Sequence, residues 1–498
     1  MRFWLSVLLS VATASVAAAE TVLRIGTRLL PATEAAPFTS ILLPSSLVHH
    51  AIYDTLTLVA PDGSVRPWLA TGWRMENPTT WVFELRRDVN FSTGAPFTAD
   101  AVVAAIDFLL SPAGEAESVG SQMRYNTVVG ARALGPHTVE ITTRQPDAIL
   151  PLHMMFLRIP EPETWRRLGP LDFARAPVGT GPFVVERWRD GRVALAAHRG
   201  SWRAPQVDRI DIVMIPDQAA RVQALTSGAV DIAIGLTPEE EPAIAAAGAR
   251  LHVHLKPETS FLAFVSTKPG EVKDVPVKDI RVRRALNHAV NRQAIIDTIL
   301  GGATAPASQI SHPQAFGYNA ALEPYPYDPA KAKALLAEAG FPNGFALPIL
   351  LVGGFNNFDS VYQLIGIDLA AVGVNLEILR NTPAKQQEYV YQGGWPTLGF
   401  AMTSSMFDPL GGYRIRSCAW AHPYHCDPAI MPLIEAAQVA PTPELRADLT
   451  RQVMAAERDN PPGIILWQSP GFDGVARSVV GFKASEDFIP FHALALEN

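Results

Sequence analysis

The repeated pairing of a helix with a strand is the feature that most constrains the fold of this chain. Residues 217–227 follow helical propensity, Gly228 ends that segment, and residues 230–234 have the apolar character of a strand. Residues 360–371 and 374–378 repeat the same order. Such units build sheets with helices packed on their faces, so the sequence predicts an α/β fold rather than a helical bundle or a β-sandwich.

Two further helices have clear sequence signals at their ends. Asp328 supplies an N-cap and Pro329 the first helical position, and Gly340 ends the segment. Asp279 opens an amphipathic stretch that continues to Leu300. This second stretch predicts either two consecutive helices or one kinked helix.

The amino terminus has the pattern of a secretory signal. Arg2 precedes an apolar stretch, and three alanines at 17–19 stand before Glu20. This order predicts cleavage near Ala19 and export to the periplasm, with residues 1–19 removed. No cysteine follows the predicted cleavage point, so we expect a freely diffusing protein rather than a lipid-anchored one.

Length and composition bound the remaining possibilities. With 498 residues, of which 48% are hydrophobic and 18% charged, the chain is too long for one core and too apolar for disorder. We expect two or three domains. The formal net charge of −7 is accompanied by no Lys/Arg-rich run with interleaved aromatic residues, so nucleic acid is not an expected partner.

Motifs that carry catalytic chemistry are absent from the sequence. It contains no Gly-x-Ser-x-Gly, His-Glu-x-x-His, phosphate-loop or Ser-x-x-Lys pattern. Gly179-Thr180-Gly181 is followed by Pro182, which removes a backbone donor that a dinucleotide loop would offer, so it predicts a tight turn. We therefore expect no enzyme activity, no catalytic residues and no cofactor. An exported hydrolase whose catalytic groups converge from distant positions stays open as an alternative.

The chain has two cysteines, Cys418 and Cys426, with His422 and His425 between them. In an exported chain this spacing favours a disulfide that closes a small loop. The alternative is a Cys/His site for zinc or nickel, but adjacent His425 and Cys426 are awkwardly placed to ligate one ion. The His252-Val253-His254 pair would share one strand face and, without a third ligand, is expected to be structural. No metal site is predicted.

Several segments occur in an order that resembles a known family. They are Tyr53-Asp54-Thr55-Leu56, the stretch from Trp81 to Gly94, the stretch from Pro177 to Phe183, and the helix start from Asp279 to Leu286. Together they resemble the family 5 extracellular solute-binding proteins of ABC transporters, which include oligopeptide-, dipeptide- and nickel-binding types. Phe83, Leu85, Val89 and Phe91 alternate with polar neighbours, so this stretch predicts core rather than ligand contacts.

The resemblance implies a bilobal periplasmic-binding-protein (Venus-flytrap) fold with an extra inserted domain. The implied ranges are 20–54, 177–260 and 469–498 for lobe I, 55–176 for the inserted domain, and 261–468 for lobe II.

The same resemblance implies a function. The chain would capture a short peptide or peptide-like solute between the lobes and deliver it to the membrane permease of an ABC importer, as a monomer. Its two crossings between lobes would fall near residues 257–261 and 467–470. A metal-chelate (nickel-type) ligand is the alternative within this class.

One departure from the family bears on the ligand. Peptide-binding relatives carry a loop similar to Ala-Asp-Tyr-x-Asp-Pro, whose first aspartate pairs with the amino group of the peptide. Here Asp408-Pro409 holds the register, and Ser405 stands where that aspartate would be. A serine hydroxyl supplies no counter-charge, so the resemblance does not extend to capture of a free amino terminus. The candidate ligand-binding residues are Trp395, Ser404, Ser405, Met406, Phe407, Asp408, Tyr413 and Arg414 in lobe II, with Arg124 and Tyr125 in the inserted domain.

Overall fold

The computed structural model describes most of the chain after the predicted signal. The described residues are 20–39, 45–60, 62–117, 127–266, 275–352, 358–404, 407–411, 417–483 and 489–497. The names lobe I, inserted domain and lobe II keep the ranges given above.

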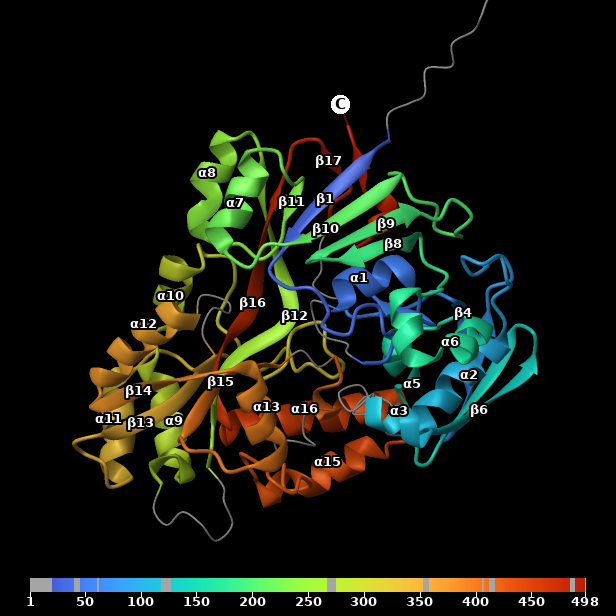
Figure 1. The fold of residues 1–498 in the computed structure, drawn as a ribbon. Coiled ribbons are helices and arrows are strands. Elements are labelled where there is room, and N and C mark those ends of the chain that lie inside the picture. The colour runs from blue at the N-terminus through green and yellow to red at the C-terminus, as the bar shows by residue number, and fades with distance from the viewer. Residues whose placement is uncertain are drawn as a thin grey trace, which may run out of the picture.

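A single long sheet runs through both lobes (Figure 1). Among the described residues it has ten strands in the order β14-β13-β15-β12-β16-β11-β1-β10-β9-β8. The strands are β1 (Val22–Thr27), β8 (Phe183–Arg189), β9 (Arg192–Ala197), β10 (Arg209–Met214), β11 (Ile232–Ala233), β12 (Arg250–Phe264), β13 (Phe345–Val352), β14 (Val374–Asn381), β15 (Gly399–Ser404) and β16 (Gly463–Val475).

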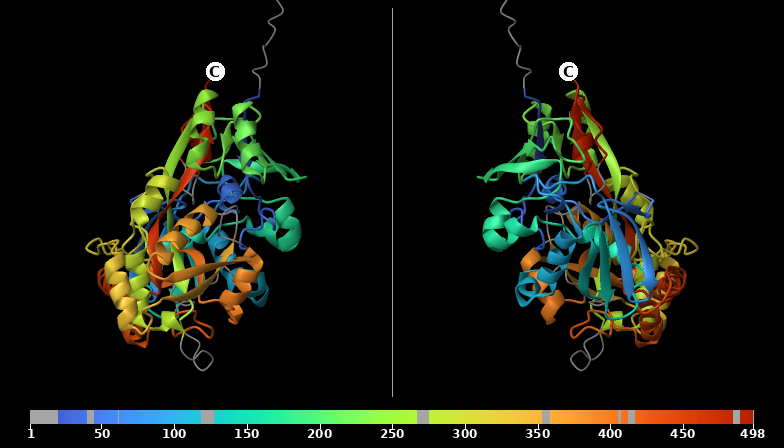
Figure 2. Two further views of the ribbon diagram at one scale, coloured as in Figure 1. Left: turned by 90° about the vertical axis from the view of Figure 1, so that its left-hand side faces the viewer. Right: turned by 90° about the vertical axis from the view of Figure 1, so that its right-hand side faces the viewer.

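The two longest strands, β12 and β16, connect the halves of this sheet. They pair antiparallel along most of their length and run from the upper to the lower part of the molecule (Figures 1 and 2). The pairing register shifts between Leu255 and Thr259 and again between Ser260 and Phe261. These irregularities fall where the sequence predicts the first crossing between lobes. Local disruption of a ladder is a place where a sheet bends.

Helices cover the lobe II half of the sheet on one face. Leu286, Ile296, Leu336 and Ile365, one from each of four helices, pack with sheet residues such as Leu262 in one buried cluster. The helices are α9 (Ile280–Ala289), α10 (Arg292–Ile299), α11 (Pro329–Glu338) and α12 (Phe358–Ala370). The other helices of lobe II are α13 (Pro383–Gln392), α15 (Met431–Gln438) and α16 (Pro443–Asp459).

The helix ends follow the sequence signals. The side chains of Asp217, Asp279 and Asp328 cap the helices that start after them, each by accepting a backbone N–H. Val290 is extended between α9 and α10, so the open alternative resolves to two helices. Gly340 takes the left-handed conformation that ends a helix, with φ of +92°.

The inserted domain is built around a small antiparallel sheet of order β4-β5-β7-β6. Its strands are β4 (Ala70–Asn77), β5 (Thr80–Leu85), β6 (Val128–Gly135) and β7 (Thr138–Thr143), preceded by the hairpin of β2 (Thr57–Val59) and β3 (Val65–Pro67). Its helices are α2 (Ala99–Leu110), α3 (Pro112–Glu117), α5 (Leu150–His153) and α6 (Pro162–Arg175). Phe83 and Phe91 are almost fully buried, which confirms them as core.

Lobe I is completed by short elements around its half of the long sheet. They are α1 (Ser45–Ile52), α7 (Gln218–Thr226), α8 (Glu241–Ala246), β17 (Val479–Val480) and β18 (Ala495–Leu496). One apolar cluster joins lobe I residues such as Leu23 and Ile25 to Trp81 and Phe83 of the inserted domain. Lobe I and the inserted domain therefore share a continuous core.

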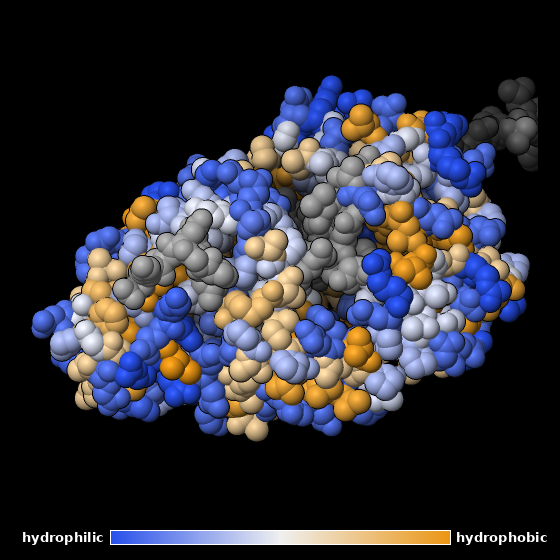
Figure 3. Space-filling model, turned by 90° about the horizontal axis from the view of Figure 1, so that it is seen from below, coloured by the Kyte–Doolittle hydropathy of each residue, from blue (hydrophilic) through white to orange (hydrophobic). Residues whose placement is uncertain are grey.

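The face seen from below mixes hydrophilic and hydrophobic residues (Figure 3). In the part of the chain that the structure describes, no helix combines the length and hydropathy needed to cross a membrane.

Candidate functional site

The candidate site begins where β15 ends near the crossing between lobes. Ser404 pairs with Thr259 of β12, and Met402 pairs with Phe261 two residues further along. Residues two apart on a strand share a face, so Ser404 continues the row of Met402 and Phe400. The Thr259 hydroxyl is buried and has no hydrogen-bond partner among the described residues. This end of the strand pair therefore places two buried hydroxyl side chains, Thr259 and Ser404, side by side.

Phe407, after the end of β15, contacts the inserted domain. Its side chain is 6% exposed and packs with Ile149 and Leu152 in a small buried apolar cluster. The backbone N–H of Phe316 donates to the Phe407 carbonyl at 2.7 Å. Phe407 thus joins lobe II to the inserted domain.

Asp408 lies at the same contact and is fully engaged. One carboxylate oxygen accepts from Arg446 of α16 at 2.8 Å, and the other accepts the backbone N–H of Leu410 at 3.1 Å. The Nε2 atom of His153 lies 3.7 Å from the first oxygen, an ion-pair distance. Asp408 is therefore not an unpaired carboxylate available to a solute.

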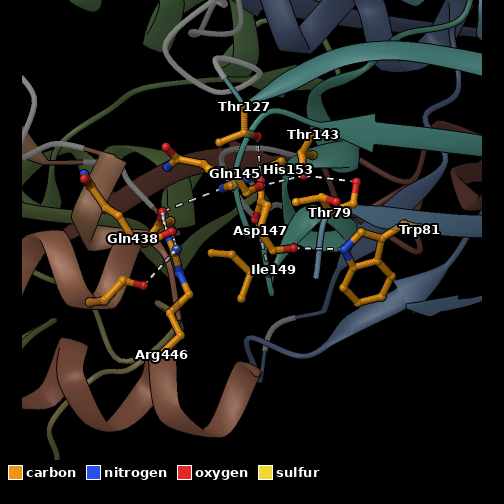
Figure 4. A network of polar contacts seen from close by, with 12 residues as sticks. Thr79, Trp81, Thr127, Thr143, Gln145, Asp147, Ile149, His153, Gln438 and Arg446 are labelled. Carbon is orange, nitrogen blue, oxygen red and sulfur yellow. Dashed lines mark hydrogen bonds and ion pairs between the residues drawn. The ribbon is translucent and has the colours of Figure 1, made fainter. Parts of the chain in front are cut away.

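His153 stands between two carboxylates from different parts of the molecule, and Figure 4 shows it beside Asp147. Its Nδ1 atom lies 3.2 Å from Asp147, which also accepts from the Thr127 hydroxyl at 2.7 Å. Burial by itself would lower the pKa of His153, but the carboxylates of Asp147 and Asp408 outweigh it and raise the pKa to about 9. At neutral pH His153 is therefore a cation that donates a hydrogen bond to Asp147 and forms an ion pair with Asp408.

The pKa values of Asp147 and Asp408 are lowered, whereas that of His153 is raised. Burial would raise the pKa of Asp147, yet His153 and Arg446 hold that pKa well below its usual range. The pKa of Asp408 is also lowered, because Arg446 and His153 outweigh the effect of its burial. The four groups form a charge-balanced chain of two cations and two anions.

Trp395 lies apart from the group around Asp408. Its ring stacks on Phe400 at 4.0 Å between centroids and is 6% exposed. It lines a pocket of about 190 Å³ together with Ser266 and Thr397. Phe400 lies four residues from Ser404 along β15, so their side chains are on the same face of the sheet. Trp395, which stacks on Phe400, therefore lies near the opposite end of β15 from Ser404.

The remaining predicted ligand residues cannot be placed. Ser405, Met406, Tyr413, Arg414, Arg124 and Tyr125 lie outside the described residues, as does the predicted signal at 1–19.

The cysteine loop packs within lobe II, where it contacts the residue that follows β12 by two positions, Ser266. Cys418 and Cys426 form a disulfide, and the neighbouring His425 has its Nδ1 atom 2.6 Å from the Ser266 hydroxyl. Across the described ranges, no group of three or more His, Cys, Asp or Glu side chains is arranged to hold a metal ion. His252 and His254 share a face of β12, as predicted, with their rings 5.7 Å apart.

Three members of the ionic chain were not identified from the sequence. Asp147, His153 and Arg446 belong to no motif, and they lie 6 to 299 residues apart in the sequence. His153 meets Asp408 only because the inserted domain contacts lobe II in the folded molecule. Only the tertiary structure brings them together.

Two α/β lobes joined by a pair of crossing strands define the class of two-lobed binding proteins. Residues 64–419 match the family described as bacterial extracellular solute-binding proteins, family 5. The protein belongs to this family. It is a family of solute-binding proteins and not of enzymes.

Individual relatives agree with this assignment. The chain is 30% identical over 341 residues to the glutathione-binding protein GsiB of Salmonella choleraesuis, covering 67% of this chain and 64% of that protein. It is 31% identical over 356 residues to the nickel-binding periplasmic protein of Escherichia coli, covering 66% of this chain and 65% of that protein. The matches thus span somewhat under two thirds of these relatives.

Solved structures extend the likeness to the whole fold. The Helicobacter pylori periplasmic binding protein DppA, in complex with the peptide STSA, superposes with a TM-score of 0.80. The alignment covers 96% of this chain and 98% of that one at 22% identity. The expected mixed α/β periplasmic-binding-protein fold is confirmed.

Proposed function

We propose that this protein is the periplasmic substrate-binding component of an ABC importer, which captures a short peptide or peptide-like solute between its lobes and delivers it to a membrane permease. The pairing of β12 with β16 through both lobes carries the proposal. The two strands join lobe I to lobe II, and they are paired on both sides of the register shifts, where the sheet can bend. This is the construction that opening and closing around a solute requires.

Closure supplies both retention and signalling in this proposal. A solute that contacts both lobes binds the closed form more tightly, and so shifts the equilibrium toward it. The permease can then distinguish the loaded protein from the empty one by shape. No bond is made or broken, in keeping with the lack of catalytic motifs.

The charge of Asp408 narrows the solute class. The loop 404–409 has one carboxylate, and it is paired with Arg446 and faces His153. Ser405 offers a hydroxyl where peptide-binding relatives have an aspartate. We therefore propose a solute whose end at this loop is not a free ammonium, such as a peptide-like molecule with a modified or absent amino group.

The proposed contacts to that solute keep the predicted residues except Asp408, whose carboxylate is already paired with Arg446 and faces His153. In lobe II they are Trp395, Ser404, Ser405, Met406, Phe407, Tyr413 and Arg414, and in the inserted domain Arg124 and Tyr125. Of these, Ser404 has the most direct structural support, since it lies beside the buried Thr259 hydroxyl.

Native mass spectrometry of protein purified from its own periplasm tests the proposal. We expect a bound small molecule of one mass that is released unchanged on denaturation. A peptide with a free amino terminus would contradict the inference about the solute end, and Ser405→Asp would then be expected to tighten its binding. Release of a chemically converted product would contradict a pure binding function.

A metal chelate is the second candidate, favoured by the likeness to the nickel-binding periplasmic protein. In this structure both cysteines are in a disulfide, so the Cys/His loop does not offer thiolates. Thiol titration of the unfolded, unreduced protein decides between the alternatives for this loop. No free thiol supports the disulfide, whereas two free thiols would support a metal-binding role.

A further inference from the structure

The ionic chain at Asp408 is also the contact that joins the two sides of the molecule. Asp147 and His153 belong to the inserted domain, while Asp408 and Arg446 belong to lobe II. The inserted domain shares its core with lobe I. Any opening of lobe II away from lobe I must therefore separate His153 from Asp408.

Apolar packing accompanies the charges at the same place. Phe407 and Phe316 of lobe II pack against Ile149, Leu152 and Phe156 of the inserted domain. The side chains of Asp147, His153, Asp408 and Arg446 are between 1% and 13% exposed. Water is largely excluded, so the charges are weakly screened and their attraction is stronger than it would be on the surface.

The pairs on each side survive separation of the lobes. Asp147 stays with His153 in the inserted domain, and Asp408 stays with Arg446 in lobe II. Neither half leaves a buried charge without a counter-ion when the contact opens. The His153 to Asp408 contact can therefore form and break repeatedly without the large cost of isolating a charge.

We infer that His153 is a closing latch, a protonated imidazole that holds the inserted domain on lobe II by its attraction to Asp408. Such a latch is not part of the proposed function, but its biological role rests on that function. It would set how strongly the closed form is favoured before and after a solute enters. Within the described ranges, the charged groups that face His153 are Asp147 from its own segment and Asp408 from lobe II, and Arg446 lies behind Asp408 as its ion-pair partner.

The latch has a defined pH range. His153 binds its proton more tightly in the closed form, where it has two carboxylate neighbours, than in an open form that keeps only Asp147. Its contribution to closure is therefore present below a pH of about 9 and is lost as the pH rises through that value. Because the pKa values of both aspartates are lowered, the contribution persists down to the ordinary carboxyl range near about 4.

Paired spin labels can measure the separation directly. Leu171 of the inserted domain and Ile367 of lobe II are 81% and 66% exposed, so Leu171→Cys and Ile367→Cys supply labelling sites. The native cysteines are joined and do not compete for label. The measurement uses the full chain, freed of bound solute by unfolding and refolding.

At pH 7 we expect the His153→Gln variant to shift the distance distribution toward longer separations, with the closed-to-open ratio falling by roughly tenfold or more. His198→Gln is the matched control and should leave the distribution unchanged, because in the described part of the chain the His198 ring has a single hydrogen-bond partner, the Gly181 carbonyl, which also lies in lobe I. An unchanged distribution in folded His153→Gln protein overturns the latch.

A pH series on the unsubstituted labelled protein provides the second measurement and does not depend on a variant that folds. The open population should rise as the pH passes about 9, and His153→Gln should show no such transition. A flat response in both proteins rejects the inference. Since no solute is present, failure here leaves the proposed function untouched, and an absence of bound solute in native mass spectrometry leaves the latch untouched.

Discussion

At the scale of single residues, the buried carboxylate of Asp54 holds together segments that are far apart in the sequence. This shared contact is a physical reason why several separate motifs occur together in the chain. The Asp54 carboxylate accepts hydrogen bonds from the side chains of Trp68, Thr180, Trp202 and Arg203. Thr180 comes from the Gly179-Thr180-Gly181 turn, which the sequence predicts to be structural. Distant segments of lobe I and the inserted domain therefore meet at one buried charge.

Replacing Asp54 should test this role. In Asp54→Asn the Arg203 guanidinium, which is 3% exposed, would lose its counter-ion. We expect the free energy of unfolding in urea to fall by about 3–5 kcal/mol. Asp172→Asn is the control, since its pair with Arg175 is exposed and should change stability by less than about 0.5 kcal/mol. Equal effects of the two substitutions would contradict the assignment.

Asp473 predicts a pH dependence of stability. Burial raises its pKa to about 6, although the Gly235 N–H at 3.0 Å opposes the shift. The folded state thus binds this proton more tightly than the unfolded state, so the ionised carboxylate destabilises the fold above a pH of about 6 and protonation relieves the cost below it.

The Asp473→Asn variant should therefore be more stable than the unsubstituted protein at pH 7, by up to about 3 kcal/mol. The difference between the two proteins should shrink at pH 5. Urea midpoints at both pH values provide the measurement. A difference that does not vary with pH would show that Asp473 is not the responsible group.

At the scale of elements, the sequence predicts what depends on local signals. The helix starts at Asp279 and Asp328 are confirmed because an N-cap satisfies its own helix within a few residues. The contact of His153 with Asp408 was not predictable, because it joins residues from different domains through no motif. The sequence singled out Phe407 and Asp408 as ligand contacts, and it did not predict that they meet Ile149, Leu152 and His153 of the inserted domain.

The length of β12 was also beyond sequence reasoning. A strand of 15 residues that serves both lobes has no periodicity of its own, since its burial pattern changes where it passes from one lobe to the other. Residues 250–256 are exposed or half-buried, and residues 257–264 are buried throughout. Tertiary packing on both faces of lobe II overrides the simple alternation of a half-buried strand.

A double-mutant cycle can test the crossing itself. The hydroxyls of Ser260 and Ser469 lie 2.7 Å apart and are buried between β12 and β16. Either Ser260→Ala or Ser469→Ala leaves one buried hydroxyl without a partner, and should cost about 1–3 kcal/mol. The double variant should cost clearly less than the sum of the two. Simple additivity in urea unfolding would mean that the two hydroxyls do not interact.

At the scale of the whole molecule, the shared core bears on the domain ranges. Leu23 and Ile25 of lobe I belong to the same buried cluster as Trp81 and Phe83 of the inserted domain. Lobe I and the inserted domain are therefore separate in chain order but are not independent folding units. We propose that lobe I and the inserted domain fold together.

Deleting residues 55–176 and joining the ends with a Gly/Ser linker tests this. Lobe I would lose a large part of its apolar contacts, whereas lobe II keeps its own buried cluster. We therefore expect the shortened protein to lose amide hydrogen-exchange protection in lobe I while lobe II stays protected, and the full chain to be protected in both. Retained protection of lobe I in the shortened protein would show that the inserted domain is a separable unit.

The continuous ladder between β12 and β16 also limits how the lobes can move. Two independent flexible linkers would allow rotation about several axes. Here the strands are hydrogen-bonded to each other on both sides of the register shifts, so neither can twist or slide without the other. Bending across the irregular stretch is the remaining soft motion of the strand pair. If the lobes close around a solute as proposed, each closure would follow this one bending motion and return Phe407 and Asp408 to the same position against the inserted domain.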